Sequence, residues 1–328
     1  MSNSKSPAKF LLPILLAIGS VQPGAVRAEL PDAPAASAPA RALAQARSWG
    51  YQLQKIDPNV LAGAPYDVLV LDYSRDGTEE RALTARELRQ IKMKPDGGER
   101  IVLAYLSIGE AETYRYYWNE SWSLEGSAPA WLGRENKKWR GNIGVRYWDE
   151  EWQKIIFTGA DSYLDRIVGA GFDGIYLDKV DQYVAAEKEV ADARDRMVAF
   201  VTALAKRARS LKPGFLVVPQ NAEELLSDAE YRAAIDGLGK EDLLFGEVKA
   251  KRPNDPEQVE ENIGLLKLLT AEGKPVFAVE YIDAPEDIEY ARATLEEHGF
   301  IPHFAKRSLD RMRFGDLPEP PRKSTKGR

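Results

Sequence analysis

Short apolar runs alternate with longer amphipathic segments along most of the chain. Eight apolar runs are predicted to be β-strands: Trp49–Gln52, Val68–Asp72, Ile101–Ile108, Gly174–Asp178, Phe215–Pro219, Asp242–Phe245, Val276–Tyr281 and Phe300–Phe304. Several of these runs are continuously apolar instead of alternating between apolar and polar residues. This pattern is typical of parallel strands that are buried on both faces.

Amphipathic segments lie between most of the predicted strands. Four of them are predicted to be helices: Thr84–Lys92, Trp152–Gly169, Glu187–Ser210 and Glu257–Ala271. Repeated strand–helix alternation predicts parallel βαβ units. About eight strands are spread evenly, and no glycine-rich phosphate-binding motif follows the first of them. The pattern therefore favours a single-domain α/β fold, a closed (β/α)8 TIM-like barrel, over an open doubly wound sheet.

The first 28 residues are predicted to be a signal peptide. Lys5 and Lys9 form a short basic region, Phe10–Ile18 is an apolar stretch, and the tripeptide 26–28 (VRA) is a small-x-small cleavage site. The apolar stretch is far shorter than the roughly 20 residues of a transmembrane helix. An uncleaved N-terminal anchor is the alternative. We expect an exported protein, periplasmic or extracellular, with no transmembrane span after cleavage.

The composition defines the remaining boundaries. Residues 29–45 are rich in alanine and proline and are predicted to be a linker. Residues 46–316 form the predicted barrel domain, and residues 317–328 are predicted to be a disordered basic tail. The sequence contains no cysteine, which excludes disulfide bonds, cysteine nucleophiles and thiolate metal sites.

The formal net charge is −6 at pH 7 and becomes −9 without the signal peptide, which carries three cations and no acid. An acidic protein is a poor match for nucleic acid, which favours a basic surface. It suits a neutral or cationic polymer, although surplus surface carboxylates also serve solubility. We expect a monomer that binds a polysaccharide.

Polar residues end or closely follow most of the predicted strands: Asp72, Glu110, Asp178, Gln220, Asn221 and Glu280. Glu241 is the exception, since it directly precedes the predicted strand Asp242–Phe245. In a parallel barrel the chemistry lies at the C-terminal ends of the strands. An unpaired charge buried there costs free energy, which favours a functional interpretation. Asp178 ends an apolar run abruptly in GFDGIYLDKVD and is the strongest single signal.

Each of these residues also has a structural interpretation. Asp72 could cap a helix or a turn, and Glu110 could begin a helix whose dipole favours a carboxylate. Asp181 is more consistent with a cap. Glu280 follows apolar residues in VFAVEY and could pair with a basic neighbour such as Lys179 instead of contacting a substrate.

Two well-placed carboxylates are what glycoside hydrolysis requires. One carboxylic acid with a raised pKa protonates the leaving oxygen, and the other attacks the anomeric carbon or activates water. The connection after the third predicted strand adds aromatic residues that could stack on sugar rings: Tyr114, Tyr116, Tyr117, Trp118, Trp122, Trp131, Trp139, Tyr147 and Trp148. A packed subdomain over the barrel mouth explains these residues equally well.

A set of motifs in one order resembles a known family. The motifs are YDVLVLDYS, IVLAYLSIGEAE, GFDGIYLDKVDQY, VVPQNAEELL, IDGLGKEDLLF and VFAVEY, and they resemble glycoside hydrolase family 114, the endo-α-1,4-polygalactosaminidase-like proteins. The resemblance extends from about Trp49 to about Ala305. It implies a (β/α)8 barrel that hydrolyses α-1,4-linked galactosamine-containing polysaccharides, such as partly deacetylated biofilm exopolysaccharide, without a cofactor or metal.

The resemblance also implies roles for individual residues. Asp178 matches the family's nucleophile, and Glu241 in GKEDLLF matches its acid/base. Glu247 is a rival for the acid/base because it follows the predicted strand Asp242–Phe245. The predicted substrate-binding residues in the same motifs are Asp72, Tyr105, Glu110, Lys179, Asn221, Glu280 and Tyr281. Carboxyl groups about 5–5.5 Å apart would predict a retaining mechanism, and a separation of about 6.5–9.5 Å would predict inversion.

Two other classes of protein are weighed against the hydrolase. A non-catalytic polysaccharide-binding barrel would keep the aromatic residues but hold one carboxylate too far away. A metal-dependent deacetylase would need ligands, and the sequence offers only His298 and His303, neither of which lies in a paired-ligand motif. His303 falls near the end of the eighth predicted strand and could reach the cleft.

Overall fold

The computed structural model describes residues 36–124 and 126–312. The predicted signal peptide (1–28) and basic tail (317–328) lie outside these residues. Within the described ranges no helix is long and apolar enough to cross a membrane.

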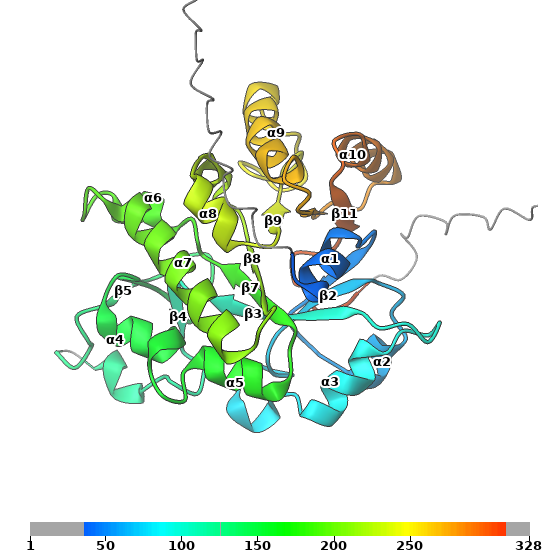
Figure 1. Ribbon diagram of the computed structural model, residues 1–328. Helices are drawn as coiled ribbons and strands as arrows, with labels where there is room; N and C mark the ends of the chain where they lie inside the picture. The colour runs from blue at the N-terminus through cyan, green and yellow to red at the C-terminus, as the bar shows by residue number, and fades with distance from the viewer. Residues whose placement is uncertain (1–35, 125, 313–328) are drawn as a thin grey trace, which may run out of the picture. The chain divides into compact units, whose positions relative to one another are not determined.

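Eight parallel strands form the centre of the structure (Figure 1). Five of them pair in the order β1-β2-β3-β7-β8, with bounds Trp49–Gln52, Val68–Leu71, Ile101–Ser107, Gly174–Asp178 and Leu216–Pro219. Three more pair in the order β9-β10-β11, with bounds Leu238–Glu241, Val276–Glu280 and Ile301–Phe304. Neighbours in sequence are therefore neighbours in space, as the predicted strand–helix alternation requires.

The two groups of strands join into a barrel. Between β8 and β9, Gln220 bridges to Gly239, and the Asn221 N–H donates to the Gly239 carbonyl at 2.7 Å. Between β11 and β1, the Trp49 Nε1–H donates to the Ile301 carbonyl at 2.9 Å. The predicted (β/α)8 barrel is confirmed.

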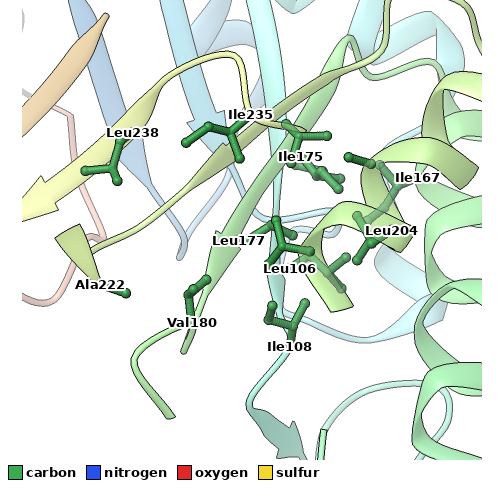
Figure 2. Close-up of a cluster of buried hydrophobic side chains, with 14 of the residues drawn as sticks. Leu106, Ile108, Ile167, Ile175, Leu177, Val180, Leu204, Ala222, Ile235 and Leu238 are labelled. Atoms are coloured by element: carbon green, nitrogen blue, oxygen red, sulfur yellow. The ribbon is translucent and has the colours of Figure 1, made fainter. Parts of the chain in front are cut away.

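The barrel separates two hydrophobic cores, because successive side chains along a strand point to opposite faces. Trp49, Tyr51 and Tyr176 belong to the inner core together with the alternate residues of the other strands. The intervening residues pack outward, where Figure 2 shows Ile175 and Leu177 of β7 between the strands and the helices. Residues two positions beyond an inner-core residue consequently face the top of the barrel interior.

Helices cover the outer face of the strands. They are α2 (Pro58–Ala62), α3 (Ala85–Lys92), α4 (Glu150–Gln153), α5 (Tyr163–Ala170), α6 (Gln182–Ala186), α7 (Ala193–Leu211), α8 (Ala229–Ala234), α9 (Pro256–Thr270) and α10 (Pro285–Glu297). Short helical turns lie at Glu79–Arg81, Glu120–Ser123 and Glu223–Ser227, and a π-helical turn lies at Lys154–Thr158.

Two predicted helices are shorter than expected. The single helix predicted over Trp152–Gly169 is wrong, because Asp161 takes a left-handed φ of 63° and Ser162 begins α5 with a capping box. The helix predicted to begin at Glu187 begins at Ala193 instead. In the first case the hydrophobic spacing continues across a break that the Ser162 capping box imposes, whereas α7 begins after Asp192 without a side-chain cap hydrogen bond.

The sixth predicted strand, Asp242–Phe245, is also wrong, since the barrel strand is β9, four residues earlier. Its interior position is Gly239, where an added Cβ would lie 1.8 Å from the Tyr176 hydroxyl, so only glycine lets Tyr176 fill the interior. The apolar residues that follow leave the sheet, and the N–H groups of Leu244 and Phe245 donate to the Glu280 carboxylate.

The predicted linker, residues 29–45, is corrected in its last part. Residues Ala38–Ala44 form α1, whose N-terminus is capped by the Ser37 side chain. Leu43 is fully buried in the inner core, and Pro39 lies against Gly214 just before β8 begins. This helix therefore closes the end of the barrel where the strands begin.

The aromatic-rich connection after β3 is a small antiparallel sheet of β4 (Glu110–Glu112), β6 (Asn142–Val145) and β5 (Leu132–Glu135), in that order. Most of its aromatic side chains pack on each other. Trp122 lies edge-on between Trp118 and Trp131, and Trp131 contacts the fully buried Trp152. The packing interpretation is thus the better one for most of these residues.

Candidate active site

A cavity of about 770 Å³ lies at the C-terminal ends of the strands. Its lining comes from the ends of β2, β3, β7, β8, β9 and β10 and from the segments after β1 and β11. The predicted residues among its lining are Asp72, Tyr105, Glu110, Asp178, Lys179, Asn221, Glu241 and Tyr281. Tyr114 and Trp139, both about half exposed, are the members of the predicted aromatic set that line it.

Asp178 is the last residue of β7 and lines the cavity. Its Oδ2 accepts a hydrogen bond from the Tyr105 hydroxyl at 2.6 Å, and its Oδ1 accepts from the Lys179 N–H at 2.7 Å. Burial raises the pKa of Asp178 to about 6, against the opposing effects of the Lys179 charge and the Tyr105 hydrogen bond. The carboxylate is thus kept ionised by donors in a site that otherwise disfavours charge.

Glu241 is the last residue of β9 and lies beside Asp178. Its Oε1 accepts a hydrogen bond from the Tyr281 hydroxyl, and its backbone N–H donates to Asn221 Oδ1 at 3.0 Å. Burial, followed by the negative charge of Asp178, raises the pKa of Glu241 to about 7. Of the two carboxyl groups, Glu241 is therefore the one that keeps a proton to higher pH.

Gln220 joins the two carboxylates. Its single Nε2 donates to Asp178 Oδ1 at 3.1 Å and to Glu241 Oε2 at 2.7 Å, while its Oε1 accepts from the Tyr51 hydroxyl at 3.1 Å. Since both carboxylate oxygens lie within 3.1 Å of one nitrogen, they cannot be more than about 6 Å apart. The bond from Tyr51 fixes which end of the amide faces the carboxylates.

The chain turns sharply after each of these three residues. Lys179, Asn221 and Asp242 directly follow Asp178, Gln220 and Glu241 and have left-handed φ values of 61°, 56° and 52°. L-residues other than glycine adopt this conformation at a cost, and such strain gathers at functional sites. The turn leaves each strand-ending side chain pointing into the cavity while the backbone departs.

A second group of buried charges lies at the end of β2. The two terminal nitrogens of the Arg115 guanidinium, Nη1 and Nη2, donate to Asp72 at 2.9 and 2.8 Å, and its Nε donates to Glu112 at 2.6 Å. The side chains of Arg115, Glu112 and Asp72 are at most 6% exposed. Asp72, predicted to bind substrate, thus has both carboxylate oxygens engaged by a cation inside the protein.

Glu110 and Lys179 occupy another part of the cavity wall. Glu110 accepts hydrogen bonds from Asn136 Nδ2 at 2.8 Å and from Asn142 Nδ2 at 3.2 Å, which anchors the β5–β6 hairpin to the end of β3. The Lys179 ammonium lies 3.7 Å from Glu110 and 3.8 Å from Asp181. Lys179 therefore pairs with these acids and not with Glu280, the partner considered from the sequence.

Two predicted acids lie outside the cavity. Glu280 is fully buried, but it is one position out of phase with the interior-facing Val279 and Tyr281, so it points out of the barrel. Its carboxylate accepts the N–H groups of Leu244 and Phe245, and burial raises its pKa to about 8. The prediction that Glu280 binds substrate is corrected. Glu247, the rival acid/base, is exposed and bonds Gln258.

Three site residues were given no role from the sequence. Gln220 follows β8 directly, so the sequence placed it at the end of a strand. Its bridging role also depends on Glu241 of β9 and Tyr51 of β1, which the sequence alone does not bring together. Tyr51 ends the apolar run of β1 and resembles a core residue. Arg307 lies beyond the last predicted strand and lines the cavity from there, and no motif signalled it.

Neither histidine lies in the cavity lining. His303 is buried between Trp49 and Tyr66, and His298 lies at the C-terminal end of α10. Among the residues in the described ranges, no group of three or more His, Asp or Glu side chains is arranged to hold a metal ion.

Residues 30–316 match the sequence profile of glycoside-hydrolase family GH114. The chain belongs to this family. An uncharacterized protein from Deinococcus radiodurans is 36% identical over 275 residues, which cover 83% of this chain and 84% of that protein. The predicted family and the prediction of a glycosidase are confirmed for this GH114 member.

Two solved structures share the fold. The glycoside hydrolase domain of PelA from Pseudomonas aeruginosa has a TM-score of 0.61 at 18% identity, over 81% of this chain and 97% of that domain. Ega3 from Aspergillus fumigatus, solved in complex with galactosamine, has a TM-score of 0.57 at 16% identity, over 82% of this chain and 94% of that protein.

Proposed function

We propose that this GH114 protein is an exported, endo-acting glycoside hydrolase that cleaves α-1,4-linked galactosamine-containing polysaccharide with retention of configuration. Asp178 is the nucleophile and Glu241 is the acid/base. The other predicted cavity residues, Asp72, Tyr105, Glu110, Lys179, Asn221 and Tyr281, surround these two or hold them in position.

The observation that carries the proposal is the Gln220 bridge. The bridge keeps the facing oxygens of Asp178 and Glu241 within about 6 Å. Retaining enzymes hold their carboxyl groups about 5–5.5 Å apart, whereas inverting enzymes leave about 6.5–9.5 Å for a water molecule. The facing oxygens are thus closer together than the inverting range, which favours direct attack by a carboxylate on the anomeric carbon.

The division of roles follows from the surroundings of the two groups. Asp178 accepts from three donors, which favours its ionised form and suits a nucleophile. Glu241 has the higher pKa, about 7 against about 6 for Asp178, which suits a group that must first donate a proton. Once the glycosyl–enzyme ester has formed, the Asp178 charge that raised the pKa of Glu241 is gone. Glu241, which has already given its proton to the leaving oxygen, is therefore stable as a carboxylate and acts as the base that takes a proton from the attacking water.

The substrate class rests on the charge of the cavity and on a structural relative. Carboxylates outnumber cations in the lining, which favours a polymer with ammonium groups over a polyanion. Ega3, which shares the fold, was solved with galactosamine. Tyr114 and Trp139 are partly exposed aromatic side chains in the lining that could contact sugar rings. Export rests on the N-terminal sequence pattern, and comparing the N-terminus of the cell-associated and released protein tests it.

The test is reducing-end release from a partly deacetylated α-1,4-galactosaminogalactan. We expect Asp178→Asn and Glu241→Gln to lose at least about 10³-fold of the activity, because each removes a group that acts on the reacting bond. Glu247→Gln, in an exposed residue outside the cavity, should keep it. Circular dichroism verifies that all variants fold, and early products of mixed length distinguish endo from exo action.

Two outcomes would contradict parts of the proposal. Activity retained by Glu241→Gln would remove Glu241 from the acid/base role. A first-formed product with inverted anomeric configuration in an NMR time course would rule out the covalent intermediate. If the polymer binds but is not cleaved by the unmodified protein, the non-catalytic polysaccharide-binding barrel becomes the better interpretation.

A further inference from the structure

The segment after β11 places a cation over the site. The Arg307 guanidinium lies 4.2 Å from the centre of the Tyr281 ring, and its Nη2 donates to both carboxylate oxygens of Asp242 at 2.7 Å. Asp242 directly follows Glu241 in the chain. The reaction outlined above uses neither Arg307 nor Asp242.

Tyr281 links this pair to the acid/base. Its hydroxyl donates to Glu241 Oε1 while its ring face carries the Arg307 guanidinium. A cation on the ring face is attracted by the ring's negative potential and draws electron density from the phenol. The hydroxyl therefore becomes a stronger donor toward the ionised form of Glu241. Asp242 opposes this effect, since it neutralises the cation and adds a negative charge near Glu241.

We infer that Arg307 and Asp242 are positioning residues, a charge pair that sets the protonation of Glu241 through Tyr281. The inference rests on the proposed function only in taking Glu241 as the acid/base. The pair does not have the burial of a structural ion pair, since the Arg307 side chain is 42% exposed and that of Asp242 is 16% exposed. Ion pairs that solvent reaches contribute little to stability, and the Arg307 end of this pair is open to solvent.

Apart from Asp178, the charged groups that act on Glu241 are Arg307 and Asp242. Asp178 at the end of β7 raises the pKa of Glu241 by its like charge. Gln220 and Asn221, which follow β8, are neutral, and Tyr281, which follows β10, donates a hydrogen bond. Tyr51 of β1 and Tyr176 of β7 are buried phenols whose pKa values are raised well above the usual range, so both are neutral at working pH. Arg307 lowers the pKa of Glu241 and Asp242 raises it.

The two members of the pair therefore make opposite predictions. Arg307→Met removes the cation and leaves Asp242 unpaired, so the basic limb of the kcat/KM profile should move up by about 0.5–1 pH unit. Asp242→Asn should move the same limb down by a similar amount. The double variant should return it close to the limb of the unmodified protein. The acidic limb, which Asp178 sets, should move little in all three.

Controls separate this role from a structural one. Arg307→Lys keeps the charge and should keep the limb in place. Lys251→Met removes a partner of Asp283 in another exposed ion pair, outside the cavity lining, and should shift nothing. Shifts of the same sign in Arg307→Met and Asp242→Asn, or no shift in either, would overturn the inference, whatever happens to the rate.

A measurement without turnover distinguishes the inference from the proposed function. The Glu241 carboxyl carbon, identified in a ¹³C-glutamate NMR spectrum by its loss in Glu241→Gln, can be titrated directly in each variant. Opposite pKa shifts would support the charge pair even if Glu241 were not the acid/base. Unchanged titration would overturn the pair even if the hydrolase activity were confirmed.

Discussion

Two pairs of carboxylates lie at the same end of the barrel and differ in what stands between them. Asp72 and Glu112 share the guanidinium of Arg115, which is permanently charged. Asp178 and Glu241 share the amide of Gln220, which is neutral. A central cation forms ion pairs with both of its neighbours, whereas a central amide gives them hydrogen bonds and no opposite charge.

The difference explains why Asp178 and Glu241 are suited to catalysis, whereas Asp72 and Glu112 stabilise the fold. Burial raises the pKa of both Asp178 and Glu241, and the negative charge of Asp178 raises that of Glu241 further, so joint ionisation of the two is disfavoured near neutral pH. One protonated and one ionised carboxyl group are what an acid and a nucleophile need. The Arg115 cluster instead ties the end of β2 to the inserted sheet, whose first strand contains Glu112.

Removing the central cation, Arg115, should have the largest effect, and the effect should be on stability. Arg115→Met leaves two buried carboxylates unpaired, so we expect a loss of about 3–5 kcal/mol in the free energy of unfolding. Urea denaturation measures it. The matched variant Arg115→Met with Asp72→Asn and Glu112→Gln removes the stranded charges and should recover much of that loss. Equal losses in both variants would show that packing, and not charge, accounts for the effect.

Changing the central amide should affect activity more than stability. Gln220→Glu keeps the shape but places a third carboxylate between Asp178 and Glu241, and we expect kcat/KM to fall about 10²-fold. Because a like charge raises both pKa values, both limbs of the pH profile should move up. A pH series of kcat/KM tests this. A profile that falls in height without moving would contradict the comparison.

Removing a single hydrogen-bond donor to the nucleophile should reduce kcat/KM by a smaller factor. Tyr105→Phe removes a hydrogen bond that lowers the pKa of Asp178, so the acidic limb should move up from near pH 6. The carboxylate must be ionised to attack, and activity is therefore lost first on the acidic side. We expect about a 10-fold loss of kcat/KM below the optimum and less above it. A uniform loss at all pH values would point to substrate contact instead.

The smallest effect should come from the cavity rim. Trp139 is 50% exposed and lines the cavity, so Trp139→Ala should raise KM several-fold on the polymer, by about 1 kcal/mol of binding, with little change in kcat. Trp122→Ala, in the packed part of the same insertion, should lower stability instead of raising KM alone. A similar kinetic effect from both would remove Trp139 from substrate binding.

Much of the fold could be predicted because buried parallel strands are continuous apolar runs. The exception is β9, which has the sequence LGKE and is not an apolar run. Its interior position is Gly239, which must be glycine because Tyr176 fills the space beside it. The apolar residues DLLF that follow were therefore predicted to be the strand instead. The family motif nevertheless selected Glu241. The bridging role of Gln220 could not be predicted, because an amide between two carboxylates is defined by three strands at once. Leu43 was missed because a single buried leucine gives an Ala/Pro-rich segment no hydrophobic period.

The seam between the first and last strands has a consequence for how the chain folds. Trp49 reaches Ile301 across a sequence separation of 252 residues, and Leu43 packs into an interior that includes Ala305. Contacts of such long range form late and slow the folding of small domains. A ribosome or a translocation channel delivers the N-terminus first, so these side chains stay uncovered until almost the whole domain has emerged. The barrel is expected to assemble as open βα units that a chaperone could recognise, and to close in its final step.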